Sequence, residues 1–266
     1  MVLAGVTASG LLTTPVRGEE VIEIATRPGQ TVRALLIDAP APKGGVILLA
    51  GGRGHLRLSN TGAIGWGRRN QLVRTRALYA RAGFVTVLPD IASDLAIESD
   101  DLHGYRVSEA HADDIGFIVA HLRSIVARVY LIGTSSAALS VANAASRLAG
   151  TRAPDGIVIT SGMLMHVDIA HPSVQTDVPR LASIKQPTLL VSHQHDVCAY
   201  SMPSSAAEFR PLLTGAARVD SVALFGGHSG DGEPCGPESH HGFLGMDSEV
   251  VGTITTWLHS LPRLQR

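Results

Sequence analysis

The sequence predicts an α/β protein built on a mostly parallel, doubly wound sheet with helices on both faces. Short runs of consecutive apolar residues, such as 46–50 and 129–132, are typical of strands that are buried on both sides. These runs alternate along the chain with segments whose apolar residues recur every three or four positions, as they do on one side of a helix. Glycine-rich or polar segments follow several of the strands, at the sheet edge where such folds place their working residues.

The chain opens with a predicted antiparallel hairpin. Residues 20–26 and 31–37 alternate apolar and polar side chains, and a Pro-Gly turn separates them. A buried strand over 46–50 follows, then a helix that ends at Gly83 and a strand over 84–88. The apolar side of that helix is formed by Leu72, Val73, Ala77 and Ala80.

The second half of the chain continues the alternation after an acidic segment, 89–107, for which we predict no regular element. The remaining strands are predicted at 129–132, 156–160, 187–191 and 219–225. About 25 residues separate the second and third of these strands, which leaves little room for a lid domain. A Ser205-x-x-Glu208 capping box is expected to begin one helix. The predicted helices bury Ile115, Ile118, Val119 and Leu122; Val141, Ala144, Ala145 and Leu148; Phe209, Leu212 and Leu213; and Val250, Val251, Ile254, Trp257 and Leu258.

The composition favours one soluble domain. The chain has 266 residues, 45% of them hydrophobic, so we expect a single domain over 19–266. Residues 1–18 resemble either the end of a secretory signal that has lost its basic start or a disordered terminus. The 22 basic and 23 acidic residues give no indication of a nucleic-acid partner. No apolar run approaches the ~20 residues that cross a bilayer, so we expect no membrane span, and no feature specifies an oligomeric state.

A Gly-x-Ser-x-Ala sequence centred on Ser135 directly follows one of the predicted strands. A strand that turns sharply into a helix of small residues lifts such a serine onto the tip of the turn. Gly133 and Ala137 stand where a larger side chain would collide with the turn, whereas a turn centred on Ser136 would place the branched Thr134 there. Ser135 is therefore the predicted nucleophile; the alternative is a chance turn sequence.

A serine hydroxyl needs a histidine to accept its proton and a carboxylate to orient that histidine. Asp196, in the loop after the strand that ends at Val191, is the predicted carboxylate. His241 is the predicted base because it enters the closing helix almost at once, which fixes its position. His228, which precedes a Gly-rich excursion of the chain, is the alternative base, and His240 ranks third.

The two cysteines flank the predicted acid and base. Cys198 lies two residues after Asp196, and Cys235 lies six residues before His241. A disulfide between them would stabilise the fold by roughly 3 to 4 kcal/mol and hold the base near the nucleophile. The alternative is two unpaired buried thiols. A disulfide would favour a periplasmic or secreted protein, with a cytoplasmic location as the alternative.

Stabilising a tetrahedral intermediate requires two backbone N–H groups directed at the developing oxyanion. Ser136, directly after the nucleophile, is predicted to supply one of them. Gly52, in the glycine-rich loop after the strand at 46–50, is predicted to supply the other, with Arg53 as the neighbouring alternative. The same loop lacks the third glycine and the Gly-Lys-Ser/Thr of nucleotide-binding loops, so we expect no nucleotide there.

Together these features resemble the α/β-hydrolase superfamily. They are the serine turn at Ser135, the Gly51-Gly52 loop, Asp196 and a late histidine, in that family's order Ser, Asp, His. The resemblance covers about residues 20–260, and the segment 235–243, Cys-Gly-Pro-Glu-Ser-His-His-Gly-Phe, also resembles a little-characterised bacterial subgroup of that superfamily.

The resemblance implies an eight-stranded sheet, no cofactor, and an acyl-enzyme on Ser135 that is resolved by a water molecule activated by His241. The sequence departs from the family at two positions. Ala137 stands where the turn usually has glycine, which is a small change. Ala50 stands where many members have a histidine before the oxyanion glycine, which leaves open how that loop is supported.

Two other patterns compete with this interpretation. His193-x-His195 with Asp196 has the spacing of a metal half-site that His240-His241 could complete, but ligation would remove the carboxylate from the serine mechanism. We therefore expect no metal. The arginines near the oxyanion loop are either a solvated surface or an anion-binding rim; they are Arg53, Arg57, Arg68, Arg69, Arg74, Arg76 and Arg81. Three further residues are candidates to line the pocket, namely His103, His166 and Arg106.

The sequence thus favours a serine hydrolase that cleaves a carboxylic ester of a small molecule. Esters rank above amides because the mechanism makes few demands on an alkoxide leaving group. The alternatives are a peptidase or thioesterase and, from another class, a catalytically inactive hydrolase fold that serves as a binding module.

Overall fold

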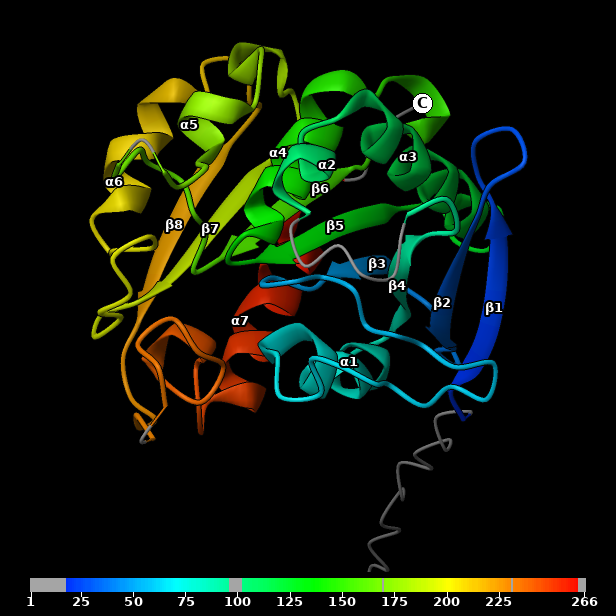
Figure 1. Cartoon of the computed structure of the whole chain (residues 1–266), viewed down its shortest axis with the longest axis horizontal. Coiled ribbons are helices and arrows are strands. Elements are labelled where there is room, and N and C mark those ends of the chain that lie inside the picture. The colour runs from blue at the N-terminus through cyan, green and yellow to red at the C-terminus, as the bar shows by residue number, and fades with distance from the viewer. Residues whose placement is uncertain (1–17, 96–101, 169, 231, 263–266) are drawn as a thin grey trace, which may run out of the picture.

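An eight-stranded sheet lies at the centre of the protein in the computed structural model (Figure 1). The structure describes residues 18–95, 102–168, 170–230 and 232–262, so the predicted signal remnant or disordered terminus lies outside the described residues except for Gly18. The strand order is β1-β2-β4-β3-β5-β6-β7-β8. The strands are β1 (Glu20–Ala25), β2 (Thr31–Ile37), β3 (Gly44–Leu49), β4 (Phe84–Ala92), β5 (Val129–Thr134), β6 (Gly156–Thr160), β7 (Thr188–His193) and β8 (Val219–Leu224).

The pairing of the strands confirms a mostly parallel sheet. β1 and β2 form the predicted antiparallel hairpin, with Ile22 opposite Ala34, and β2 pairs antiparallel with β4. Every later pair is parallel. The order reverses between β3 and β5, where connections leave the sheet on opposite faces, and ligand sites in such sheets form at this point.

Helices cover both faces of the sheet, as the doubly wound prediction requires (Figure 1). Side chains alternate along β3: Val46 and Leu48 pack with α1 and α7, whereas Ile47 and Leu49 pack with α3 and α4. Each face therefore has its own apolar core. The helices are α1 (Gln71–Arg81), α2 (His103–Arg106), α3 (Glu109–Arg123), α4 (Ala137–Arg147), α5 (Val174–Asp177), α6 (Ser205–Phe209) and α7 (Asp247–Ser260).

The segment predicted to be irregular, 89–107, contains regular structure at both ends. β4 continues through Pro89 to Ala92, and the short helix α2 follows the undescribed residues 96–101. Proline is tolerated in this strand because β3 pairs with β4 only as far as Val87, so the missing N–H of Pro89 interrupts no ladder with β3. The antiparallel partner β2, which is distant in sequence, extends the strand.

The predicted capping box at Ser205 is wrong. α6 begins at Ser205 itself, and the residue before it, Ser204, makes no capping hydrogen bond through its side chain. Ser204 has helical backbone angles, φ −63° and ψ −28°, instead of the extended conformation that directs a capping side chain at the helix end.

The structure has no large lid between β6 and β7 within the described residues. The connection contains α5 and a single 3-10 turn, Leu181–Ser183. Within the described ranges, no helix combines the length and apolar character needed to cross a bilayer. That residues 19–266 form a single folding domain stays a prediction.

Candidate active site

The predicted sharp turn joins β5 to α4 with Ser135 at its tip. Ser135 has φ 56°, in the left-handed region that a residue other than glycine adopts only when its surroundings impose it. The turn is held by the Ser135 N–H, which donates to the carbonyl of Thr160 at 2.9 Å. Gly133 must be small, because an added Cβ would lie 2.6 Å from Cγ2 of Val141. The small residue at position 133, which predicts the turn from the sequence, is therefore also required by the packing of the turn.

The glycine-rich loop after β3 lies directly against this turn. A Cβ on Gly51 would lie 2.8 Å from the Cβ of Ser135 and would overlap the carbonyl oxygen of Thr134. Gly52 follows with φ 62°. Among the described residues, none accepts a hydrogen bond from the backbone N–H of Gly52 or of Ser136. Both predicted oxyanion donors are therefore unengaged beside Ser135.

A buried arginine supports the loop from beneath. Nη2 of Arg106 donates to the carbonyls of Ala50 and Gly52, both at 3.1 Å, and Nη1 donates to Ser140 Oγ at 2.9 Å. The hydroxyl of Ser136 donates to the Gly52 carbonyl at 3.2 Å. Arg106 is 3% exposed, and burial lowers its pKa to about 10. The expectation that Arg106 lines the pocket is wrong: Arg106 binds the carbonyls of the loop and is not among the residues that line the cleft of Ser135.

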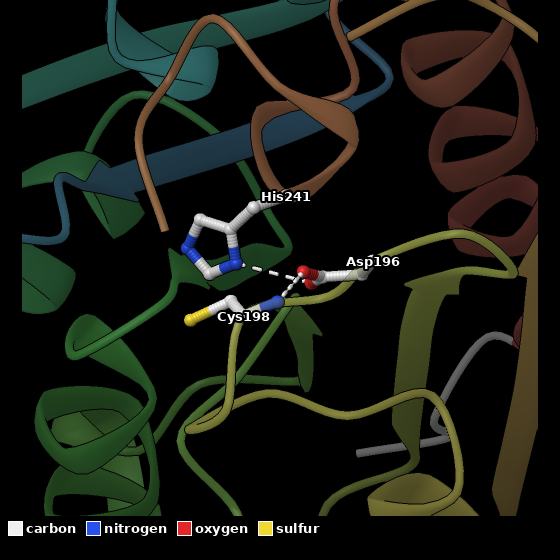
Figure 2. A group of neighbouring side chains, drawn as sticks. All are labelled: Asp196, Cys198 and His241. Carbon is white, nitrogen blue, oxygen red and sulfur yellow. Dashed lines mark hydrogen bonds and ion pairs between the residues drawn. The ribbon is translucent and has the colours of Figure 1, made fainter. Parts of the chain in front are cut away.

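His241 and Asp196 meet in the protein interior (Figure 2). Asp196 lies in the loop after β7, and His241 lies in a 3-10 turn, His240–Gly242, after β8. Nδ1 of His241 is 3.0 Å from Oδ2 of Asp196, and the backbone N–H of Cys198 donates to Oδ1 of that carboxylate at 2.9 Å. Nε2 of His241 is buried and has no hydrogen-bond partner among the described residues. Nε2 of His241 is therefore free to accept a proton.

A third side chain, Ser201, completes this group and was not predicted. Its hydroxyl donates to Oδ2 of Asp196 at 2.9 Å and lies 2.8 Å from Nδ1 of His241. Because the single hydroxyl proton goes to the carboxylate, the oxygen is left to accept from the imidazole N–H. The imidazole proton is therefore shared between a carboxylate and a hydroxyl.

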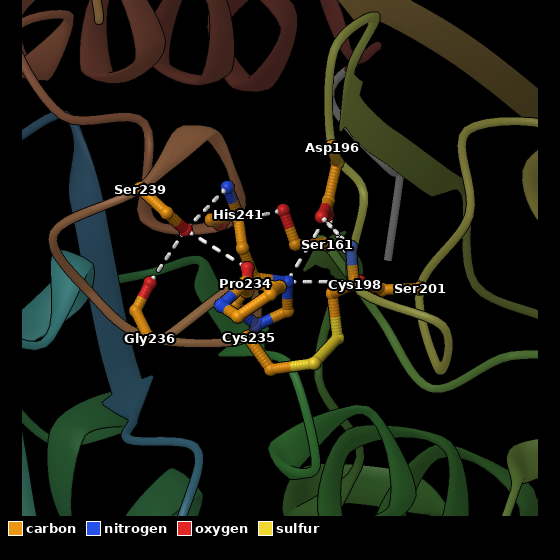
Figure 3. Close-up of a disulfide and its surroundings, with 9 residues drawn as sticks. All are labelled: Ser161, Asp196, Cys198, Ser201, Pro234, Cys235, Gly236, Ser239 and His241. Atoms are coloured by element: carbon orange, nitrogen blue, oxygen red, sulfur yellow. Dashed lines mark hydrogen bonds and ion pairs between the residues drawn. A yellow bond between two sulfur atoms is a disulfide. The ribbon is translucent and has the colours of Figure 1, made fainter. Parts of the chain in front are cut away.

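Two further serines fix the backbone of His241 (Figure 3). The hydroxyl of Ser161 donates to the carbonyl of His241 at 2.8 Å, and the N–H of His241 donates to Ser239 Oγ at 3.1 Å. Ser239 in turn donates to the carbonyls of Pro234 and Gly236. The loop that carries His241 is therefore held by bonds on both sides of the imidazole.

A disulfide joins the loop that carries Asp196 to the loop that carries His241. Cys198 and Cys235 are bonded, with their Cα atoms 4.7 Å apart and their positions 37 apart in sequence (Figure 3). The alternative of two unpaired thiols is thereby excluded. A cross-link that closes a loop of this size removes entropy from the unfolded chain worth about 3 to 4 kcal/mol.

The alternative histidines are placed elsewhere. His228 is exposed and packs beside Gly245. The ring of His240 stacks on that of His193 with centroids 4.4 Å apart, and burial, together with the neighbouring histidines, lowers the pKa of His240. Neither forms a hydrogen bond with the carboxylate of Asp196 within the described part of the chain.

The alternative metal site is not supported by the donor atoms present. His193 is fully buried and uses both ring nitrogens, Nε2 toward the carbonyl of Gly226 at 2.9 Å and Nδ1 as acceptor from the N–H of His195 at 3.0 Å. Asp196, His241 and Cys198 do lie close together, but the sulfur of Cys198 is committed to the disulfide.

Ser135 and His241 open onto a common cleft of about 570 Å³. The cleft is bounded by the oxyanion loop, the N-terminal end of α1 and the disulfide; its walls include Gly52, Trp66, Arg68 and Cys235. His103, His166 and Arg106 are not among the residues that line it. The predicted nucleophile, base and oxyanion loop thus face the same space.

Comparison with known proteins identifies the architecture. No protein-family model matches the chain, and no curated protein matches it at a significant level. An esterase from Pyrococcus furiosus superposes with a TM-score of 0.64 and 15% identity, over 91% of this chain and 91% of that one. A dienelactone hydrolase from Anabaena variabilis gives 0.62 and 15%, over 92% and 99%. A predicted CIB-like hydrolase from Thermoplasma acidophilum gives 0.56 and 17%, over 93% and 100%. The chain has the α/β-hydrolase fold.

Within the α/β-hydrolase fold, the predicted site residues follow β5, β7 and β8, at the carboxyl ends of parallel strands. The structure brings together Ser135, His241 and the Gly52 loop in one cleft, with Asp196 behind the histidine. His228 is not among the residues that line this cleft. Sequence reasoning missed Ser201 and the supporting role of Arg106, because neither stands in a local pattern that indicates its partner.

Proposed function

We propose that this protein is a serine hydrolase that cleaves a carboxylic ester of a small molecule. In this proposal Ser135 is the nucleophile, His241 the general base and Asp196 the residue that orients it. The observation that carries the proposal is that a strained serine shares a cleft with an imidazole whose Nδ1 is bonded to a buried carboxylate and whose Nε2 is unpaired. The structural neighbours named as an esterase and a dienelactone hydrolase support ester chemistry.

Acylation begins when Oγ of Ser135 attacks the ester carbonyl carbon. The hydroxyl proton passes to Nε2 of His241, and the carbonyl electrons move to oxygen, which becomes an oxyanion. The unengaged N–H groups of Gly52 and Ser136 are available to donate to that oxyanion. Collapse of the intermediate breaks the bond to the alkoxide, which leaves as an alcohol with the proton from Nε2.

Deacylation repeats these steps with water in place of serine. His241 accepts a proton from the water as its oxygen attacks the acyl carbon, and the proton is then returned to Oγ of Ser135 as the carboxylic acid departs. Asp196 stabilises the imidazolium that forms in both halves of the reaction. In each half of the reaction His241 takes up one proton and releases it again, so no reactant other than the ester and water is needed.

An active-site-directed fluorophosphonate tests this proposal. We expect covalent labelling of the wild-type protein and none of Ser135→Ala, with Ser146→Ala, a serine of α4 that does not line the cleft, as the control that keeps the label. Folded wild-type protein that resists labelling would point to a binding module. Parallel assays with 4-nitrophenyl butanoate, its anilide and its thioester then separate esterase from peptidase and thioesterase activity.

The disulfide supports the accompanying proposal that the protein works in an oxidising compartment, such as the periplasm or the cell exterior. Fractionation of the native host, followed by alkylation of free thiols in each fraction, tests this. Reduced protein confined to the cytoplasm would contradict the proposal.

A further inference from the structure

The arginines between residues 53 and 81 have separate roles in the structure. Arg74 and Arg76 pair with Asp247 and Glu19, each at 2.8 Å, and Arg69 pairs with Glu238. Arg68 lines the cleft of Ser135, as Arg69 does, but Arg68 has no carboxylate partner among the described residues.

Arg68 is anchored in a way that leaves its charged end available. Its Nε donates to the carbonyl of Ile64 at 2.6 Å, and its two terminal nitrogens hydrogen-bond to no described residue. A guanidinium held at Nε presents the remaining N–H groups as a planar pair, which matches the two oxygens of a carboxylate. The anchored geometry reduces the entropy lost when an anion binds.

The surrounding wall of the cleft favours negative charge as well. None of its lining residues is Asp or Glu. The N-terminal end of α1, an 11-residue helix with no acidic residue in its first turn, forms part of the wall through Asn70 and Gln71. A helix N-terminus attracts anions through its partial positive charge and free N–H groups.

We infer that the ester cleaved by this protein carries a carboxylate and that Arg68 binds it at the N-terminal end of α1. This inference rests on the proposed function, since it concerns the substrate of the Ser135 site. The carboxylate belongs to either half of the ester, so the test needs one pair of substrates for each half.

The experiment compares kcat/KM for charged and neutral esters of similar size. For the acyl half, the pair is mono-4-nitrophenyl glutarate and 4-nitrophenyl butanoate. For the alcohol half, it is 3-butanoyloxybenzoate and phenyl butanoate. The variants are Arg68→Gln and, as a matched loss of one charge at the far end of α1, Arg81→Gln.

We expect Arg68→Gln to lower kcat/KM by about 10-fold for the charged ester of one pair and by less than about 2-fold for its neutral counterpart. Arg81→Gln should leave both within about 2-fold. Added salt should reduce the wild-type preference for the charged ester, because the arginine is exposed to solvent.

The inference is overturned if Arg68→Gln changes charged and neutral esters by the same factor, or changes neither. In both cases turnover of the neutral ester shows that the serine hydrolase proposal stands. If the folded wild-type protein cleaves none of the four esters and resists the fluorophosphonate, the proposed function fails and this inference falls with it.

Discussion

The hydroxyl oxygen of Ser201 lies 2.8 Å from Nδ1 of His241, slightly nearer than the Asp196 carboxylate oxygen at 3.0 Å. The imidazole proton therefore has two acceptors, and one of them is neutral. Since the hydroxyl also donates to Asp196, removing it weakens the orientation of the base and the support of the carboxylate together.

We expect Ser201→Ala to lower kcat by about 3- to 10-fold, the value of one ordinary hydrogen bond. KM should stay unchanged, because Ser201 does not line the cleft. Ser201→Thr should restore most of the activity by restoring the hydroxyl. Steady-state kinetics on a 4-nitrophenyl ester measure this; an alanine variant with unaltered kcat would show that Asp196 orients the base alone.

The position of the base separates His241 from His228. We expect His241→Ala to lower kcat by about 10³-fold or more, as loss of a catalytic base does. His228→Ala should retain most of the activity, because that side chain is exposed and is not among the residues that line the cleft. The same ester assay compares them, and the reverse ranking would assign the base to His228.

Because Arg106 supports the loop that carries Gly52, we expect its replacement to lower both the reaction rate and the stability of the fold. In Arg106→Met the carbonyls of Ala50 and Gly52 lose a buried donor, and each unpaired group costs about 1 to 3 kcal/mol. We also expect kcat to fall by about 10²-fold, as when an oxyanion donor is misplaced. Urea unfolding and kinetics give the two values. Arg152→Met, which removes a partly exposed arginine remote from the loop, serves as the control, and an equal loss of kcat there would contradict a specific role.

Reduction of the disulfide should lower stability by about 3 to 4 kcal/mol and also lower activity, since the acid and base loops lose their covalent link. Thermal unfolding and ester hydrolysis, each with and without a phosphine reductant, measure the two effects. The doubly substituted Cys198→Ser, Cys235→Ser protein should behave like the reduced wild type and be insensitive to reductant. Full activity after complete reduction would show that noncovalent contacts suffice.

A histidine remote from the cleft predicts how stability depends on pH. His111 is partly exposed as a residue, but its Nε2 is buried, and burial, then the charges of Arg106 and Arg27, lowers its pKa from 6.5 to about 3. Below pH 6.5 the unfolded chain takes up a proton that the folded chain refuses, so stability falls as pH falls toward 3.

The slope expected from His111 is at most about 1.4 kcal/mol per pH unit. His111→Phe should flatten the dependence of the free energy of unfolding on pH between 4 and 6.5, measured by urea unfolding. His121→Phe on the same helix is the matched control. Identical slopes for wild type and His111→Phe would assign the acid sensitivity to other groups.

Much of the architecture was predictable because its signals are local. Alternating apolar and polar residues located the opening hairpin, apolar runs located the buried strands, and the glycine and alanine around Ser135 indicated the sharp turn. The end of β4 was not predictable, because pairing with the distant strand β2 carries it through Pro89. The helix start at α6 failed for a related reason, since the backbone of Ser204 is set by the preceding turn and not by its own side chain.

The candidate site divides in the same way. Asp196 and His241 were predicted from their order and their places after strands, and Cys198 and Cys235 from their proximity to them. Ser201 and Arg106 contact partners up to 56 residues away in sequence, and neither has a neighbouring motif that names those partners. For Arg106 the pattern suggested a pocket residue, but its burial and its carbonyl partners make it a structural support.

The contact between Gly51 and the serine turn limits how this cleft can be redesigned. On that side the wall is main chain against main chain, with no space even for one methyl group. Trp66 also lines the cleft, and its ring would be 3.0 Å from a Cβ placed on Gly52. A protein engineer who wants to admit bulkier acids should therefore trim the indole and leave the glycines intact.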